Sequence, residues 1–295
     1  MEILLEIIMI PAVLAIIKIV VIVLLFAMPL GTFLTLMERK WSAMIQDRVG
    51  PNRANIGNFT GHGIMHLAAD GLKSIFKEDT MPKGADGFLY LIAPFFGLIA
   101  AVATFAIIPI AGPIGDFTFQ VTDIEPGLLF IFAITSLSVY GAVLAGTSSN
   151  SKFALLGGTR ASAQMISYEV FMGLALMGIF MVYGTTRVSG IVDGQNEYWF
   201  GSLIPMWGVF TQPLGFVLFF TALVAETKRA PFDAPEGESE IVAGYFLEYS
   251  GMRWSAFMLA EYVALVGVAS LITTLFFGGY HIPGYTFGKV LHSGW

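Results

Sequence analysis

Six apolar segments divide this chain of 295 residues, and their length constrains the fold more than any other feature. They cover residues 11–37, 88–111, 127–146, 161–183, 205–225 and 255–277. About 20 apolar residues in a helix span the roughly 30 Å hydrocarbon core of a bilayer. In lipid, only helices and closed barrels satisfy every backbone polar group. The pattern therefore predicts an all-α integral membrane protein: a single polytopic domain over residues 1–295, built as a bundle of six spanning helices.

Composition supports this class and excludes several others. The chain is 56% hydrophobic and 12% charged, whereas soluble domains average about 25% charged residues. Its net charge of −6 argues against nucleic acid as a partner. The absence of cysteine excludes disulfides, iron–sulfur clusters and thiolate metal sites from this chain. Its four histidines lie in loops or at the interface, so any electron carriers are expected on partner proteins.

Basic residues gather in alternate loops. The first, third and fifth loops hold twelve Lys and Arg residues, whereas the other loops and the tail hold only Arg187 and Lys289. The positive-inside rule then predicts that the odd loops are cytoplasmic and that both termini are periplasmic. The N-terminus lacks the basic region of a signal peptide and is interpreted as the start of the first span. Lys18, inside that span, is interpreted as reaching the outer interface.

Residues 60–77 of the first loop, TGHGIMHLAADGLKSIFK, place apolar side chains at helical spacing opposite a polar stripe. This pattern predicts an amphipathic helix lying in the cytoplasmic interface. His62 and His66 stand four residues apart and could bind a metal together with Asp70. A solvated polar face is the preferred interpretation, and no metal site is expected.

Carboxylates crowd the stretch between the fifth and sixth apolar segments. Residues 225–240 read AETKRAPFDAPEGESE, and further acids follow at Glu248 and Glu261. Carboxylates that share a site raise each other's pKa, so some can hold protons near neutral pH. Pro231 and Pro235 exclude a regular helix through the centre. Residues 226–254 are therefore predicted to form a cytoplasmic acidic loop, which either handles protons or is simply solvated.

Glu169 lies near the predicted bilayer centre, and an intramembrane carboxylate is a candidate functional residue. The alternative is a structural glutamate hydrogen-bonded to a neighbour such as Tyr168 or Gln164. Glu169, Glu226 and Glu261 belong to different predicted helices at similar depth. A contiguous polar path through them is therefore geometrically allowed.

These features together resemble the quinone-site membrane subunit of respiratory complex I, the H-type subunit of bacterial NADH:quinone oxidoreductases. The matching stretches are ERKWSAMIQDRVGPNR at 38–53, ADGLKSIFKED at 69–79, AGTSSNSKFALLGGTRASAQMISYE at 145–169, AETKRAPFDAPEGESE at 225–240, GYFLEYSGM at 244–252 and AEY at 260–262. They occur in order across almost the whole chain. Chance similarity among hydrophobic helices does not reproduce such charged loops.

The resemblance implies a subunit of a proton-translocating enzyme of the bacterial inner membrane, which reduces a quinone such as ubiquinone with electrons from NADH. It implies part of a quinone chamber, with peripheral quinone-site subunits, antiporter-like membrane subunits and lipid as partners. FMN and iron–sulfur clusters are implied only on partner subunits. It also implies a carboxylate path formed by Glu169, Glu226, Arg229, Asp233, Glu236, Glu238, Glu240, Glu248 and Glu261. Arg39, Asp70 and Lys73 are implied at the chamber or its entrance.

Two departures from the family and three alternatives accompany this interpretation. The family usually has eight spanning helices, so the last two are expected to be truncated or to reside elsewhere. His66 stands where many relatives have Gln. The alternatives are the homologous subunit of a membrane-bound hydrogenase or formate hydrogenlyase, a stand-alone ion transporter and a structural anchor. The RVGPNR turn and the long acidic loop favour complex I. The lack of an inverted repeat argues against a transporter, and Glu169 argues against a mere anchor.

Overall fold

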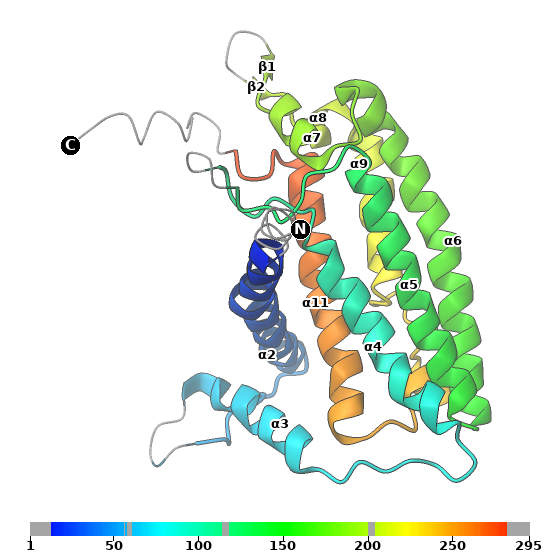
Figure 1. Cartoon of the computed structure of the whole chain (residues 1–295). Helices are drawn as coiled ribbons and strands as arrows, with labels where there is room; N and C mark the ends of the chain where they lie inside the picture. Colours follow the sequence, from blue (N-terminus) through cyan, green and yellow to red (C-terminus); the bar gives the residue numbers. More distant parts are fainter. Residues whose placement is uncertain (1–12, 56, 58–60, 114–117, 200–203, 282–295) are drawn as a thin grey trace, which may run out of the picture.

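The computed structural model describes residues 13–55, 57, 61–113, 118–199 and 204–281. Long helices standing side by side form the body of the molecule (Figure 1). One small antiparallel ribbon pairs β1 (Tyr198–Trp199) with β2 (Ile204–Pro205). The predicted start of the first span at residue 11 and the tail beyond residue 281 lie outside the described residues.

Five helices in the described part are long and apolar enough to cross a membrane, which confirms the predicted all-α polytopic class. They are Val13–Ile45, α4 (Gly87–Thr104), α5 (Gly127–Ser148), α6 (Lys152–Tyr183) and α11 (Gly251–Phe276). The first contains a π-helical turn, η1 (Val23–Ala27), followed by α2 (Met28–Ile45). The shorter helices are η2 (Gly61–Gly63), α3 (Met65–Phe76), α7 (Val188–Gly194), α8 (Gly208–Thr211), α9 (Pro213–Glu226), α10 (Glu238–Ile241) and η3 (Gly244–Phe246).

The fifth predicted span, 205–225, is wrong as a single membrane-crossing helix. It contains the end of β2, the four-residue helix α8 and then α9, which has only 14 residues. Pro213 occupies the first turn of α9, where its missing N–H costs nothing, but it cannot continue α8. At 1.5 Å per residue α9 is about 21 Å long, less than the roughly 30 Å hydrocarbon core.

Two other predicted boundaries also move. The fourth span begins at Lys152 and not at residue 161, because KFALLGGTR is helical. Gly157 in this stretch lies against η3, and a Cβ on it would meet the backbone nitrogen of Tyr245 at 2.4 Å. The second span ends at Thr104 and not at residue 111. In α6, therefore, tertiary contact stabilises helix where local composition suggested a loop.

Small residues let the central helices pack closely. Helix α4 packs on both α5 and α11, α5 packs on α6, and α6 packs on α9. A Cβ on Gly141 of α5 would lie 3.1 Å from the carbonyl oxygen of Ala93 in α4, so these backbones approach closely. Fully buried side chains such as Leu176, Phe219 and Phe276 fill the core between α6, α9 and α11.

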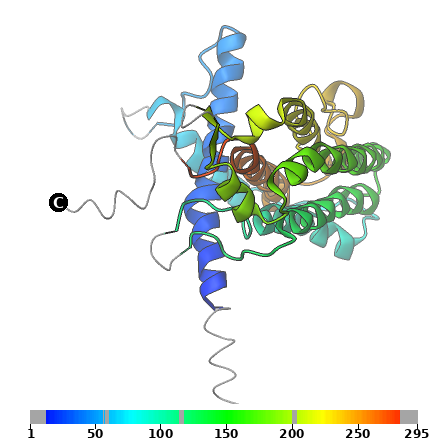
Figure 2. The same cartoon turned by 90° about the horizontal axis from the view of Figure 1, so that it is seen from above.

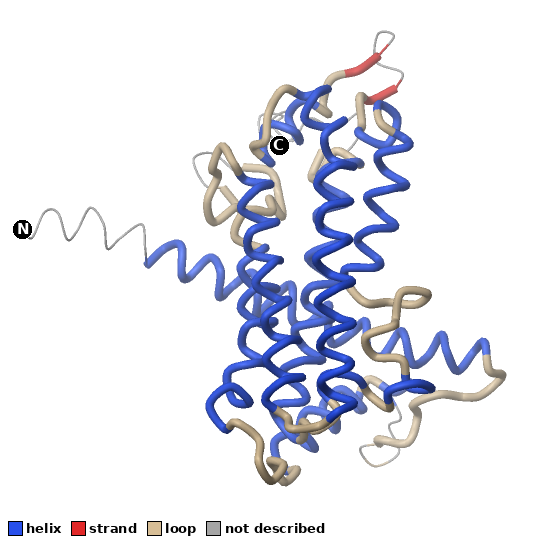
Figure 3. Tube along the Cα trace, turned by 90° about the vertical axis from the view of Figure 1, so that its right-hand side faces the viewer, coloured by secondary structure: helices blue, strands red, loops and turns tan. Residues whose placement is uncertain are grey.

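The first helix is oblique to the others (Figures 2 and 3). Its 33 residues from Val13 to Ile45 would measure about 50 Å at 1.5 Å per residue. A hydrophobic helix longer than the bilayer is accommodated by tilt. The C-terminal half of α2 lies at the side of the bundle, in contact with α3 and α11.

The loops lie at two opposite ends. Helices α4, α6 and α11 begin, and α5 ends, at the end that also carries α3 (Figure 1). The loops at this end are the basic ones, so the structure separates them from α7, α8 and the ribbon. The Lys18 ammonium reaches the opposite end, where it donates to the carbonyl oxygen of Gln120 at 3.2 Å. Which end faces the cytoplasm stays a prediction from the charge bias.

The amphipathic segment predicted at 60–77 forms α3 over Met65–Phe76, preceded by η2. The helix contacts α2 and α11, and the Ser255 hydroxyl of α11 donates to Ser74 at 2.7 Å. The His66 Nε2 accepts the backbone N–H groups of Arg53 and Ala54 at 3.0 and 3.2 Å. Its lone pair is therefore engaged in holding the preceding turn, a role that a glutamine oxygen can also fill.

Candidate functional site

The acidic loop begins partway along the bundle, because α9 ends early (Figure 1). The Gln164 side chain of α6 donates to the carbonyl oxygens of Ala225 and Phe232, at 2.8 and 2.7 Å. Gln164 lies about 18 Å along α6 from Lys152 at 1.5 Å per residue. The first part of the predicted cytoplasmic loop therefore lies beside the helices and not beyond their ends.

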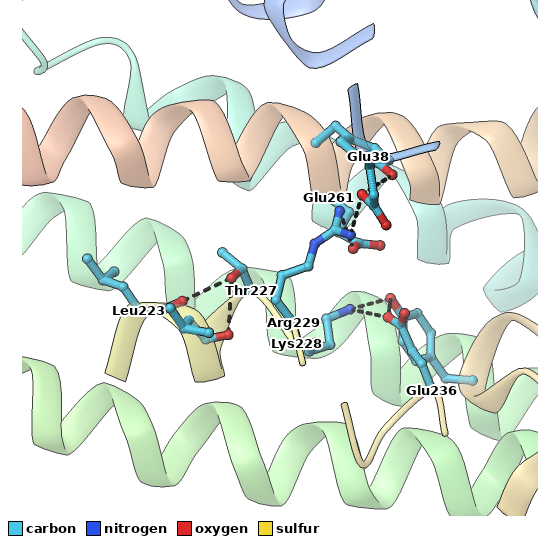
Figure 4. Close-up of polar contacts among 10 residues, drawn as sticks. Glu38, Leu223, Thr227, Lys228, Arg229, Glu236 and Glu261 are labelled. Carbon is cyan, nitrogen blue, oxygen red and sulfur yellow. Dashed lines mark hydrogen bonds and ion pairs between the residues drawn. The ribbon is translucent and has the colours of Figure 1, made fainter. Parts of the chain in front are cut away.

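Arg229 connects this loop to two helices (Figure 4). Its Nη1 lies 2.9 Å from Glu38 of α2, and its Nη2 lies 2.9 Å from Glu261 of α11. The Tyr262 hydroxyl donates to the same Glu38 oxygen at 2.8 Å, and its ring lies 4.7 Å from the guanidinium. The Glu261 side chain is only 10% exposed, so Arg229 neutralises a nearly buried carboxylate.

Lys228, the preceding residue, contacts a different carboxylate. Its ammonium lies 3.3 Å from Glu236 and donates to the Tyr245 hydroxyl. Burial by itself lowers the pKa of Lys228, but Tyr245 and the carboxylates of Glu236 and Glu261 outweigh burial, so its pKa lies above the usual value. This lysine therefore remains a cation at neutral pH. Two consecutive basic residues thus hold separate acidic groups.

Two cavities meet at these residues. An inner cavity of about 110 Å³ lies among α4, α5, α6, α9 and α11; its lining is mostly apolar but includes Glu226, Lys228 and Glu261. A larger, outer cavity of about 550 Å³ is lined by Glu38, Lys228, Arg229, Asp233, Glu236 and Glu261, among others. Lys228 and Glu261 belong to both linings. They therefore stand on the wall between the inner cavity and the outer cavity.

Glu226 and Glu169 add two carboxylates deeper in the bundle to those of Glu38, Glu236 and Glu261. One carboxylate oxygen of Glu226 is buried and makes no hydrogen bond within the described residues. Glu169 and Lys228 are ionisable groups near enough to act on it electrostatically. The Ser136 hydroxyl of α5 donates to Glu169. The structure therefore brings Glu169, Glu226 and Glu261 into one region, although Glu169 itself does not line the inner cavity.

The remaining predicted residues lie further out. Asp233 lines the outer cavity. Glu240 pairs with Arg160 at 2.7 Å on the surface. Glu248 is half-buried, and its backbone oxygen accepts the Tyr90 hydroxyl at 2.7 Å. The side chain of Glu238 lies outside the described residues.

The three residues implied at a quinone chamber or entrance lie on α2 and α3. Arg39 forms an ion pair with Asp70, which joins the two helices. Lys73 is exposed one turn further along α3. They do not belong to the lining of either cavity described above.

Sequence reasoning missed several residues of the site: Glu38, Gln164 as a contact of the loop, Lys228, Tyr245 and Tyr262. Glu38 is the first residue of the charged stretch 38–53, and Tyr262 directly follows Glu261, so both lie in or beside motifs that the sequence already singled out. Their roles were not, because each depends on contact between elements distant in sequence. Glu38 and Arg229, for example, are 191 residues apart.

Comparison with known proteins agrees with this architecture. Residues 17–293 match the NADH dehydrogenase family, which places the chain among the membrane proteins of that class. The chain is also similar to an H-type subunit of the NADH-quinone oxidoreductase of Geobacter metallireducens, with 45% identity over 258 residues. The match covers 86% of this chain and 74% of the relative. The chain therefore belongs to the family of H-type subunits of respiratory complex I, and it is a multi-pass membrane protein.

Proposed function

We propose that this chain is a membrane subunit of a proton-translocating NADH:quinone oxidoreductase in the bacterial inner membrane. It contributes part of the quinone chamber and a carboxylate path that couples quinone reduction to proton movement. One observation carries the proposal: Lys228 and Glu261 stand on the wall shared by the inner and outer cavities. Quinone is the substrate, whereas FMN and iron–sulfur clusters reside on partner subunits. Those partners are the peripheral quinone-site subunits and the antiporter-like membrane subunits.

The chemistry of the cluster supports proton transfer. An ionised carboxylate at membrane depth is costly unless it is paired or hydrated. Glu261 is paired with Arg229, whereas a buried oxygen of Glu226 has no hydrogen-bond partner within the described residues. A carboxyl group in the position of Glu226 gains from a proton or a water molecule. Neighbouring carboxyl groups, of which one is paired with a cation and another is not, can bind and release a proton in turn.

Glu169 tests the coupling part of the proposal. Glu169→Gln keeps the size of the side chain and can still accept from Ser136, but it cannot titrate. We expect the complex to assemble, with proton uptake and NADH:quinone turnover falling together by roughly tenfold or more. Proton uptake in sealed vesicles and turnover per assembled complex measure this.

Glu169→Asp and Glu169→Ala are the matched controls. Asp still titrates but is one methylene shorter, so its loss should be milder than that of Gln. If Glu169 is only structural, Gln should be tolerated, while Ala should impair assembly by removing the hydrogen bond between Ser136 of α5 and residue 169 of α6. Full proton uptake in an assembled Glu169→Gln complex would remove Glu169 from the path.

Lys73 tests the quinone part. Lys73 is exposed beside Asp70, whose carboxylate is already paired with Arg39, so a small ligand can reach the ammonium. If α3 borders the quinone entrance, Lys73→Ala should raise the quinone KM roughly threefold to tenfold without reducing assembly, as expected for loss of one polar contact. Lys83→Ala, an exposed lysine at the same end, is the control. Unchanged kinetics with quinones of every tail length would exclude an entrance role for Lys73.

A further inference from the structure

We propose that Gln164 is a positioning residue, which holds the start of the acidic loop so that Lys228 and Arg229 face different carboxylates. This inference rests on the proposed function. The Gln164 Nε2 donates to the carbonyl oxygens of both Ala225 and Phe232, at 2.8 and 2.7 Å. A side-chain amide nitrogen carries two hydrogens, so each carbonyl can receive one.

These two carbonyls bracket the basic pair. Ala225 lies in the last turn of α9, and its oxygen also accepts the N–H of Lys228 at 3.2 Å. The N–H of Phe232 donates to the carbonyl of Arg229 at 2.7 Å. Residues 225–232 thus form two tight turns, and the Gln164 side chain is hydrogen-bonded to both. Tyr168, one turn further along α6, reinforces the contact, because its ring lies 5.5 Å from that of Phe232.

The conformation between the two carbonyls needs external support. Lys228 has a φ of 54°, in the left-handed region that residues with a Cβ disfavour. Such a conformation persists only where the surroundings impose it. Here it directs Lys228 toward Glu236 and Arg229 toward Glu38 and Glu261. Without the hydrogen bonds from Gln164, Lys228 would return to a negative φ. Lys228 and Arg229 would then no longer contact the same carboxylates.

An amide suits this position because it supplies donors without charge. An ionised glutamate at 164 would direct a carboxylate at two carbonyl oxygens and add an acid to the cluster. A lysine would place a third cation beside Lys228 and Arg229. Gln164 fixes the backbone while leaving the charge balance of the cavity wall to the residues that line it.

The first test compares Gln164→Leu with Ser162→Ala in the assembled complex. Ser162 lies in the same helix, and its hydroxyl donates only to the nearby Thr159 carbonyl among the bonds described, at 2.9 Å. For Gln164→Leu we expect NADH:quinone turnover per assembled complex to fall roughly tenfold to a hundredfold, as for other misplaced groups, with the quinone KM unchanged. Amide hydrogen exchange across residues 226–236 should accelerate. Ser162→Ala should change neither the turnover nor the hydrogen exchange.

Unchanged turnover per complex, or unchanged exchange in 226–236, would overturn the positioning role. Less assembled complex with normal turnover per complex would also overturn it, because Gln164 would then be structural only. Should Gln164→Leu fail to assemble, Gln164→Asn replaces it. Its amide is one methylene shorter and cannot keep both contacts, so the same changes are expected at smaller amplitude.

A double-mutant cycle separates this inference from the function on which it rests. Arg229→Lys keeps the charge but loses the fork that reaches two carboxylates. If Gln164 acts through Arg229, adding Gln164→Leu to Arg229→Lys should lower turnover little further than the larger single effect. Effects that multiply would contradict the inference. Failure of the proposed function looks different: Arg229→Lys and Glu169→Gln would both retain wild-type proton uptake.

Discussion

Replacing Arg229 with Met is expected to reduce coupled quinone turnover roughly a hundredfold and to destabilise the assembled complex. Arg229 joins α2 to α11 through Glu38 and Glu261, each at 2.9 Å. Removing one member of a buried ion pair costs about 3–5 kcal/mol, because the other charge stays buried alone. The lower end of that range applies here, since the Arg229 side chain is 25% exposed. NADH:quinone turnover and the thermal midpoint of the purified complex measure the two effects.

A second substitution separates the electrostatic effect from the functional one. Glu261→Gln in the Arg229→Met background removes the carboxylate that was left unpaired, so assembly and the thermal midpoint should recover in part. Turnover should not recover, because the titratable group on the cavity wall is gone. Recovery of both quantities would show that the pair is structural and would contradict the proposed path.

Arg187→Met is the matched control for the same chemical change. Arg187 lies at the opposite end of the bundle, where its guanidinium is 3.8 Å from Asp123 and both side chains are more than a third exposed. Exposed ion pairs contribute about 0–1 kcal/mol. This variant should therefore keep its turnover and shift the thermal midpoint only slightly.

Gln195→Leu is expected to cause the largest loss of stability without changing turnover per assembled complex. Gln195 is fully buried between α7 and α11. Its oxygen accepts the N–H groups of Gly208 and Gly278 at 3.1 and 3.0 Å, and its nitrogen donates to the Thr274 carbonyl at 2.9 Å. Leucine would leave all three backbone groups unpaired. Each buried unsatisfied group costs about 1–3 kcal/mol, so the loss is on the order of 4 kcal/mol.

The amount of protein in the membrane and the thermal midpoint of the complex measure this effect. Gln46→Leu provides the control, because Gln46 is exposed and its side chain accepts only from the nearby Arg48 among the bonds described. Surface changes of this kind usually alter stability by less than about 0.5 kcal/mol. If Gln195→Leu complexes were as stable as Gln46→Leu complexes, the bonds of Gln195 would not stabilise this end of the bundle.

The fold class and the position of most long helices could be predicted from the order of residues alone. Lipid requires every spanning segment to satisfy its own backbone, so about 20 apolar residues suffice to recognise one. The stripe of residues 60–77 likewise predicted α3, because helical periodicity is a local property. The charged stretches at 38–53 and 225–240 indicated the family to which the chain belongs.

The pairing of the charged residues, in contrast, depends on how the helices pack. The short length of α9 follows from Pro213 at its start and from the docking of residues 225–232 on Gln164 at its end, and neither leaves a periodic pattern in the sequence. The ion pair between Glu38 and Arg229 joins residues 191 positions apart at 2.9 Å. Membrane insertion depends on composition summed along one segment, whereas an ion pair depends on the contact between separate segments. For that reason most of the carboxylates and Arg229 could be predicted as candidates, but not which carboxylates Arg229 pairs with.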